Sequence, residues 1–364
     1  MDELKKTETA APAPETAPQA KPGAIPKKTA AKPAEEKEML LVTASPHVKS
    51  PATVRGIMLD VIIALIPAGF AGIAVFGLMA AVTIAVCVCG CVVAEWIWCK
   101  AMKKPMTVGD LSAVVTGLLL AYNLPVGIPP WMCLIGCFVA IIVVKQFFGG
   151  IGKNFANPAI TARIVLLVSF ASAMTNFTAP KAADAVTSAT PLAIIGSPAD
   201  FAAAEALPKL TDMLLGLHAG CIGEVCSAAL LLGAVYLLAR RVISPVIPLC
   251  YVGTVAVFML LASKFDFTYM LYEILAGGLL LGAFFMATDY TTSPINTLGK
   301  AVFGVGCGLL TAVIRLYGSL PEGVSYSILL MNIACPLIEK FTTPAYFGQI
   351  KEKRKKKEKG GAAA

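Results

Sequence analysis

Long apolar runs, separated by charged or turn-forming residues, are the main pattern along this chain. A helix needs about 20 mostly apolar residues to cross a bilayer. Ten stretches qualify, of which the third is short and the sixth is interrupted near Gly220 and Gly223. They cover about 57–76, 78–99, 110–124, 130–148, 157–175, 211–238, 246–262, 270–288, 300–317 and 325–339. Because lipid offers the backbone no hydrogen bonds, we expect an all-α integral membrane protein with about ten transmembrane helices.

Composition supports this fold class. Of the 364 residues, 57% are hydrophobic and 14% are charged, and the mean hydropathy is +0.77. Soluble domains have about 45–50% apolar and about 25% charged residues. These values exclude a water-soluble globular enzyme and a mostly disordered protein.

More than half of the net charge of +8 lies in the C-terminal tail. Residues 1–38 carry seven basic and seven acidic groups among Ala, Pro and Thr, which is typical of a disordered tail. The tail 351–364 begins with a segment of charge +5. We therefore expect the membrane domain to cover 39–350. The first 30 residues contain no apolar region typical of a cleaved signal peptide.

Basic loops predict the orientation in a bacterial cell membrane, because cytoplasmic loops carry an excess of Lys and Arg. With the N-terminus inside, every inner loop of a ten-span topology is basic. These residues are Lys100, Lys103, Lys104, Lys153, Arg240, Arg241, Lys300 and Lys340. Both termini are then cytoplasmic, and the loop 176–209 lies on the outer face.

Ten spans divide into five plus five around this outer loop. Gly109-Asp110 and Gly223-Glu224 each place an acid after a glycine at the start of an apolar segment. This similarity hints at an internal repeat, which many transport folds contain.

The eleven cysteines favour no disulfide framework, because nearly all lie in apolar runs, where free cysteine behaves as a small hydrophobe. On a helix, Cys87 and Cys91 share a face and Cys89 points away. Core packing and ligation of a metal cluster both remain open for them, although no second cluster supplies a CxxC pair. His47 and His218 lie too far apart in the chain to indicate a zinc site.

Charged residues in spans are costly and therefore candidates for function. For Asp60, Glu95, Glu273 and Arg315 we expect side chains that reach the membrane interface. Asp110, Glu224 and Lys145 are candidates for lining a cofactor or ion site, because the two acids open Gly-flanked segments and Lys145 lies within an apolar run.

Two polar stretches at span ends add to these candidates for an ion or flavin pathway. The segment 147–158 is rich in glycine and contains Asn154 and Asn157, which fits either a close approach to a ligand or a plain turn. It lacks the spacing of a phosphate-binding P-loop. The segment 284–294 contains Asp289 among hydroxyl side chains, which could face a cofactor, an ion or lipid headgroups.

The outer loop contains the sequence Asp184-Ala-Val-Thr187-Ser188-Ala189-Thr190-Pro191-Leu192. Proline is favoured at the first helical position, so Thr190 is predicted to be an N-cap. The segment also resembles the flavinylation motif Asp-x-x-Ser/Thr-x-Ala-Thr, although that motif often has glycine where this chain has Ser188.

Further motifs resemble the NqrB/RnfD membrane subunits over residues 40–345. They are Ser45-Pro46-His47, the segment 116–125, Lys145-Gln-Phe-Phe-Gly-Gly, Asn157-Pro158-Ala, Gly223-Glu224, Phe285-Met-Ala-Thr-Asp289 and Met331-Asn332. Length and the Ser-Pro-His start are more similar to RnfD than to NqrB.

The resemblance implies FMN esterified through its phosphate to Thr190, with Asp184, Thr187, Ser188 and Ala189 recognised by a flavin transferase and Leu192 packing nearby. It also implies two inverted five-helix repeats similar to the urea-transporter fold, and in some relatives a riboflavin within the spans.

The implied function is that of a subunit of the Rnf complex, an ion-pumping ferredoxin:NAD⁺ oxidoreductase. The chain would pass electrons through FMN while Na⁺ or H⁺ crosses the membrane. Its expected partners are the other Rnf subunits, and no nucleic acid is expected among them. The alternatives are an NqrB-type subunit of a Na⁺-translocating NADH:quinone reductase and a non-redox channel or transporter.

Overall fold

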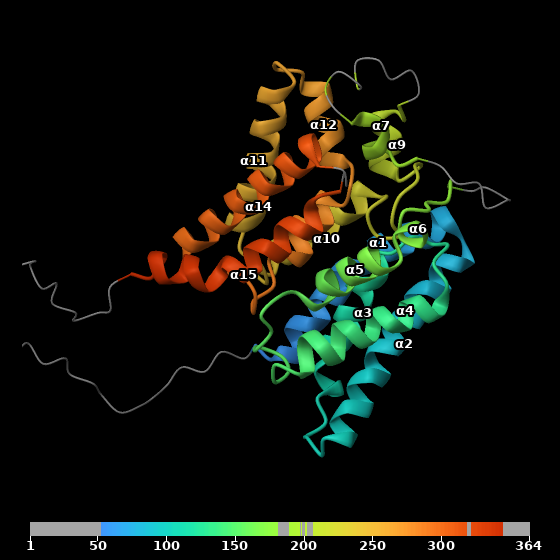
Figure 1. Ribbon diagram of the computed structural model, residues 1–364, viewed down its shortest axis with the longest axis vertical. Coiled ribbons are helices and arrows are strands. Elements are labelled where there is room, and N and C mark those ends of the chain that lie inside the picture. The colour runs from blue at the N-terminus through green and yellow to red at the C-terminus, as the bar shows by residue number, and fades with distance from the viewer. Residues whose placement is uncertain are drawn as a thin grey trace, which may run out of the picture. The chain divides into compact units, whose positions relative to one another are not determined.

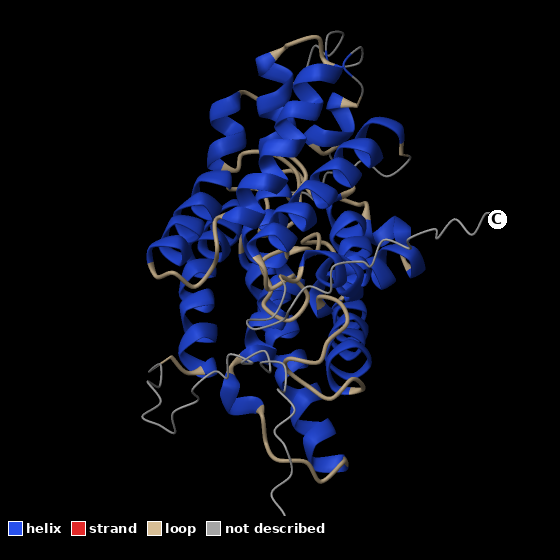
Figure 2. Cartoon of the chain, turned by 90° about the vertical axis from the view of Figure 1, so that its left-hand side faces the viewer, coloured by secondary structure: helices blue, strands red, loops and turns tan. Residues whose placement is uncertain are grey.

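The computed structural model describes residues 52–180, 189–196, 198, 201, 207–318 and 322–344, which are largely helical and joined by loops (Figure 2). The predicted tails 1–38 and 351–364 lie outside the described residues, as does the Ser45-Pro46-His47 motif. The first half of the membrane domain contains α1 (Val54–Phe76), α2 (Leu78–Ala101), η1 (Val108–Asp110), α3 (Ser112–Tyr122), α4 (Pro130–Phe138), η2 (Val139–Gln146), α5 (Pro158–Ser169) and α6 (Ala171–Met174).

The outer loop 176–209 contains α7 (Pro191–Ile195). The second half follows this loop and contains α9 (Leu210–Leu215), α10 (Ser227–Ala239), α11 (Val246–Ala262), α12 (Phe267–Leu275), α13 (Leu279–Leu281), η3 (Gly282–Met286), α14 (Thr297–Tyr317) and α15 (Val324–Thr342). Here η1 is a 3₁₀ helix, whereas η2 and η3 have π-helical hydrogen bonding.

Each of the ten predicted segments contains at least one helix. Among the described residues, α1, α2, α14 and α15 are long and apolar enough to cross a bilayer singly, and five further apolar helices are shorter. The eighth segment is a bent pair, in which α12 and the helix that follows meet at 64°. The sixth segment differs most from its prediction, because residues 216–226 separate α9 from α10 without helix. The chain is thus a helical multi-pass membrane protein, and the number of spans remains a prediction.

Several helices begin where side chains satisfy their first backbone N–H groups. The Thr53 hydroxyl accepts a hydrogen bond from Gly56 N at 3.1 Å at the start of α1. Asp266 caps α12 in the same way by accepting from Thr268 N at 2.8 Å. Such caps contribute about 1 kcal/mol each and fix where an apolar run enters its helix.

The two halves of the chain repeat one pattern of helix packing (Figure 1). In the first half α2 packs against α3 and α4, and α5 packs against α4. In the second half α11 packs against α12 and α14, and α15 packs against α14. Between the halves α1 packs against α10 and α5 against α15, so the first and last helices of one half meet their counterparts. A two-fold relation between two five-helix units would produce such a pairing.

The two Gly-acid motifs do not reflect that relation. Gly109-Asp110 precedes α3 of the third segment, and Gly223-Glu224 precedes α10 of the sixth. In the observed packing the counterpart of the sixth segment is the first, since α10 pairs with α1. The motifs therefore occupy different places in the two halves, and the repeat rests on the packing pattern alone.

The α1–α10 contact, which joins the two halves, depends on Gly233. A Cβ atom at this position would lie 2.1 Å from the Ala64 carbonyl oxygen. Helix backbones in membranes approach closely where a residue lacks a side chain.

We expect Gly233→Ala to lower the midpoint temperature of unfolding in detergent, because overpacking costs about 1–3 kcal/mol. Gly253→Ala on α11 is the matched control, since a Cβ there meets no atom within 4 Å. The control removes a flexible residue from a helix and is expected to leave the midpoint unchanged or raise it slightly. Equal midpoints for the two variants would contradict the close packing at Gly233.

Candidate functional site

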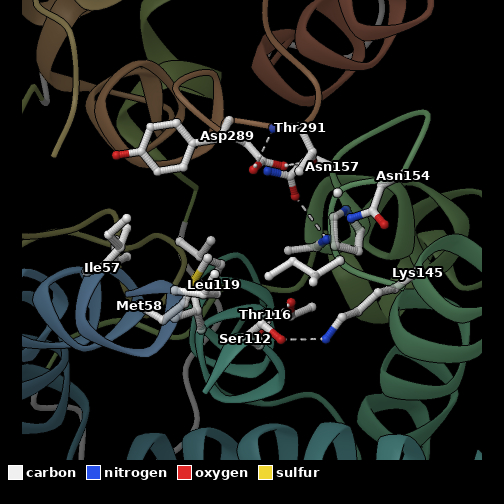
Figure 3. A pocket seen from close by; sticks show the side chains of 18 of the residues that line it. Ile57, Met58, Ser112, Thr116, Leu119, Lys145, Asn154, Asn157, Asp289 and Thr291 are labelled. Atoms are coloured by element: carbon white, nitrogen blue, oxygen red, sulfur yellow. Dashed lines mark hydrogen bonds between the residues drawn. The ribbon is translucent and has the colours of Figure 1, made fainter. Parts of the chain in front are cut away.

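Four of the six residues predicted for an ion or flavin pathway line one cavity of about 390 Å³. Its walls come from α1, α3, η2, the loop before α5 and the turn after η3 (Figure 3). Apolar side chains such as Ile57, Met58 and Leu119 line one side. The predicted residues lie on the other sides, and they are Lys145, Asn154, Asn157 and Asp289. Sequence reasoning missed Ser112 and Thr116, because isolated hydroxyls in an apolar helix carry no distinctive signal.

Lys145 is held in the cavity wall by a buried ion pair. Its Nζ lies 3.0 Å from Glu95 Oε1 and donates to Ser112 Oγ at 2.7 Å. Gln146 Nε2 and the Thr107 hydroxyl donate to the same Glu95 oxygen at 3.0 and 2.7 Å. Glu95 is 0% exposed, so the expectation that it reaches the membrane interface is wrong. Hydrogen bonds from three residues offset the free-energy cost of burying the Glu95 carboxylate.

The two asparagines in the segment 147–158 differ in role. Asn157 Oδ1 accepts from Ala159 N at 3.0 Å and so caps α5, while its Nδ2 donates to the Met286 carbonyl at 3.2 Å. This amide therefore ties the start of α5 to the end of η3, which belongs to the other half of the chain. Asn154 is half-buried, and its Oδ1 has no hydrogen-bond partner among the described residues.

Asp289 lies just beyond the end of its predicted span, in the turn after η3. Its carboxylate accepts hydrogen bonds from the Thr291 and Thr292 hydroxyls at 3.1 and 3.4 Å. Desolvation raises the pKa of the Asp289 carboxyl above its ordinary value, although these hydrogen bonds oppose the shift. The cavity thus combines one half-buried acid with one paired lysine.

The other two pathway candidates lie elsewhere. Asp110 is half-buried in η1 and does not line the cavity. Glu224 is 6% exposed and lies with Cys221 and Glu322, whose ligand atoms all fall within 4.8 Å of one another. Arg163 joins this cluster through a contact with Glu322. Glu322 was missed from the sequence because it lies in a connection between two predicted spans.

A further buried pair joins α14 to α12. Arg315 Nη1 lies 2.9 Å from Glu273 Oε2, and both side chains are 1% exposed. The expectation that these residues reach the interface is therefore wrong, because each finds its counter-charge inside the protein. Asp60 instead pairs at 3.4 Å with the exposed Arg240, which agrees with an interfacial position.

Thr190 is the N-cap of α7, as predicted, and its hydroxyl accepts from Ala193 N at 3.3 Å. The Leu192 side chain is 3% exposed and lies against the break between α12 and α13. A Cβ at Gly277 would lie 2.4 Å from Leu192 Cδ2 and 2.9 Å from Arg315 Nη2. Ala189 is exposed, whereas the motif residues Asp184, Thr187 and Ser188 lie outside the described residues.

These features define a helical membrane protein with charge pairs buried between its helices and a threonine-capped helix docked at a helix break. The chain belongs to the NQR2, RnfD, RnfE family, whose model matches residues 41–348. The resemblance expected from the motifs is thereby confirmed.

Three relatives match this chain over almost their whole length, and each is named as the D subunit of its complex. The D subunit of the "Na(+)-translocating ferredoxin:NAD(+) oxidoreductase complex" of Acetobacterium woodii is 46% identical to this chain. The match covers 87% of this chain and 98% of the relative. The D subunit of the "Proton-translocating ferredoxin:NAD(+) oxidoreductase complex" of Clostridium ljungdahlii is 42% identical, over 86% of this chain and 97% of the relative. The D subunit of the "Ion-translocating oxidoreductase complex" of Halorhodospira halophila is 36% identical, over 85% of this chain and 96% of the relative.

We expect Glu95→Ala to destabilise the protein by about 3–5 kcal/mol, because it leaves the Lys145 ammonium buried without its counter-charge. The measurement is the fraction of folded protein after heating in detergent. The double variant Glu95→Met with Lys145→Met is expected to recover most of the loss.

The matched control is Arg240→Ala, which breaks a pair whose arginine side chain is 60% exposed. Such surface pairs contribute about 0–1 kcal/mol. A Glu95→Ala protein as heat-resistant as the Arg240→Ala protein would show that the buried pair does not stabilise the fold.

Proposed function

We propose that this chain is the D-type membrane subunit of an ion-translocating ferredoxin:NAD⁺ oxidoreductase, the Rnf complex. It works with the other Rnf subunits and is not catalytic alone. Electrons pass through an FMN on Thr190 while Na⁺ or H⁺ crosses the bacterial cell membrane. The observation that carries this proposal is the Thr190 N-cap, which ends a flavinylation motif in a chain of this family.

The names of the relatives favour Rnf over the Nqr alternative, since three relatives of 36–46% identity belong by name to ion-translocating oxidoreductase complexes, two of them specific for ferredoxin and NAD⁺. The flavinylation motif argues against a non-redox channel or transporter, which would have no need of it. The relative of 46% identity is named as Na⁺-translocating, whereas the relative of 42% identity is named as proton-translocating. The names therefore favour neither ion for this chain.

The residues around Thr190 suit a phosphoester-linked flavin. Pro191, Leu192 and Ile195 are buried and anchor α7, while Thr190 is only partly buried. The attachment point is therefore held in place and open to a flavin transferase. Next to Leu192, Arg315 has a buried Nε without a hydrogen-bond partner among the described residues, which leaves a donor for a flavin oxygen. The flavin supplies the redox chemistry, and the protein supplies position and electrostatics.

The cavity of about 390 Å³ suits a second flavin, for which riboflavin is the candidate. Pockets for such ligands are mostly apolar with a few convergent polar groups. Ile57, Met58 and Leu119 supply apolar walls for a planar ring, and Lys145 and Asp289 supply polar edges. We assign these two residues, with Asn154 and Asn157, to the flavin rather than to the ion.

The proposed topology has both termini in the cytoplasm and the flavin loop on the outer face. Its support is the grouping of span ends. The ends that basic loops assign to the inner side, near Val54, Ser112, Lys145, Asn157 and Asp289, surround the cavity. Those assigned to the outer side, near Glu273 and Arg315, lie beside the α7 helix that Thr190 caps.

An inverted relation between two five-helix repeats, similar to the urea-transporter fold, follows from this topology. Five spans leave the chain on the opposite side of the membrane from where it started. The second five-helix unit therefore begins on the other face of the membrane from the first. The repeated packing of helices supports the proposal. Glu224, buried where the halves meet, is the stronger candidate for the ion pathway, and Asp110 at the edge is the weaker one.

We expect Thr190→Ala to abolish flavin fluorescence of the denatured protein band, because no hydroxyl remains to form the ester. Thr190→Ser is the matched control and is expected to retain fluorescence, since the motif accepts either hydroxyl residue at its other position. The protein must come from cells that make the flavin transferase. Fluorescence that survives Thr190→Ala would place the linkage elsewhere.

We expect Asp289→Asn to lower, by about tenfold or less, the affinity for a flavin that denaturation releases, because losing one charged hydrogen-bond partner costs about 1.5 kcal/mol. Asp110→Asn is the control, since Asp110 does not line the cavity. The measurement is released riboflavin per chain at several riboflavin concentrations, with covalent FMN as the reference. Identical release of riboflavin from both variants would show that Asp289 does not bind the second flavin.

A further inference from the structure

Two carboxylates and a thiol meet where the two halves of the chain come together. Cys221 and Glu224 belong to the irregular segment 216–226, and Glu322 precedes α15. One ligand atom from each residue lies within 4.8 Å of the other two. An ion midway between two oxygens at that separation is about 2.4 Å from each, which matches the bonds of a calcium-sized cation to oxygen. The spacing therefore lets one ion contact both carboxylates.

A backbone hydrogen bond and two glycines hold Glu224 in the interior. Gly223 N donates to the Tyr122 carbonyl at 3.0 Å, which keeps the irregular segment against the end of α3. A Cβ at Gly220 would lie 2.9 Å from Glu224 Oε1, and a Cβ at Gly278 would lie 2.8 Å from Glu224 Oε2. Glycines on two separate segments thus leave the space that this carboxylate occupies.

Glu224 differs from the other buried glutamates among the described residues. Glu95 and Glu273 each form an ion pair with a buried base. Glu224 is 6% exposed, and none of the four ion pairs in the described part of the chain includes it. A carboxylate at this depth needs a nearby positive charge or a proton. The described side chains do not supply Glu224 with a paired base.

Arg163 adds independent evidence for a ligand in this cluster. Its side chain is 4% exposed, and Nη1 donates to Asn123 Oδ1 at 3.0 Å and to Ser325 Oγ at 3.1 Å. Its Nη2 contacts Glu322 and lies 3.6 Å from Cys221 Sγ. The buried Nε has no hydrogen-bond partner among the described residues. A guanidinium that reaches into the cluster therefore keeps one free donor, which a water molecule on a bound ion would accept.

The charges of the cluster favour a monovalent cation. Two carboxylates and one guanidinium leave one net negative charge, because the Cys221 thiol is neutral while it keeps its proton. One monovalent cation makes the cluster neutral, whereas a divalent cation would leave it positive, which is costly inside a membrane. Carboxylate oxygens suit hard cations, and a thiol suits softer metals. A proton would satisfy one carboxylate only, whereas a metal ion can contact both.

We propose that Glu224 and Glu322 bind one Na⁺ inside the membrane domain, with the Arg163 Nε donating to a water molecule of the ion. Sodium is close in size to calcium and likewise binds oxygen ligands. The ion supplies the positive charge that Glu224 lacks, and it shares Glu322 with the Arg163 guanidinium. Ion sites of transporters commonly lie where interrupted helices of two halves meet. The role of this Na⁺ as the transported ion rests on the proposed function, whereas its binding does not.

The test follows the thermal unfolding of the full chain in detergent while NaCl replaces choline chloride at constant ionic strength. We expect Na⁺ to raise the midpoint temperature by several degrees, because a ligand that binds only the folded state stabilises it. Glu224→Gln removes the charge and is expected to abolish this rise. Asp60→Asn is the matched control and is expected to keep the rise, since Asp60 pairs with the exposed Arg240.

Equilibrium dialysis with radioactive sodium measures the same site directly. We expect the unchanged protein to bind one Na⁺ per chain. If Glu224→Gln fails to fold, Glu322→Gln replaces it and is expected to lower the Na⁺ affinity by about tenfold or more, because a charged ligand is lost.

A midpoint that does not respond to Na⁺ in the unchanged protein would overturn the proposal, as would an equal rise in the folded glutamine variants. Zinc bound at Cys221 in the purified protein would overturn it as well. Covalent flavin on Thr190 is measured in the same samples and reports on the proposed function separately. Retained flavin without any effect of Na⁺ would therefore refute the ion site alone.

Discussion

The structure depends on ion pairs that are buried between the helices. Lipid offers no water to solvate an isolated ion, so each buried lysine, arginine or glutamate needs a partner. Glu95 pairs with Lys145 and Glu273 with Arg315, and each pair ties together helices of one half of the chain. Arg163 reaches across to Glu322 and so ties the two halves together. These pairs limit how the apolar helices can slide or rotate, which hydrophobic contact in a bilayer would not do.

Breaks in the helices bring polar groups and glycines into the interior of the protein. The irregular segment 216–226 brings Glu224 into the interior, and the bend after α12 provides Gly277, against which Leu192 packs. Irregular backbone at membrane depth is tolerated only where protein covers it or where it lines a cavity. The same breaks end α9 and α12 early and delay the start of α10. Among the described residues, four helices are long and apolar enough to cross a bilayer singly.

Local signals predicted much of this arrangement. Apolar runs placed the helices, and Thr190 before Pro191 predicted the cap of α7. The i and i+4 spacing correctly predicted that Cys87 and Cys91 would share a face and that Cys89 would point away from it; the shared face is buried and Cys89 is exposed. The interfacial positions expected for Glu95, Glu273 and Arg315 were wrong, because a charge in an apolar run has the same local pattern whether it reaches headgroups or an internal partner.

The sequence by itself determined the class of protein, the helical segments and the flavin motif, because these follow from composition, hydrophobic length and contiguous residues. Tertiary structure decided which distant residues meet. It gathered Lys145, Asn157 and Asp289 around one cavity, and it packed α4 with Cys137 against Cys87 of α2. Such juxtapositions depend on how helices far apart in the chain pack and cross, and packing is a property of surfaces that no local run of residues contains.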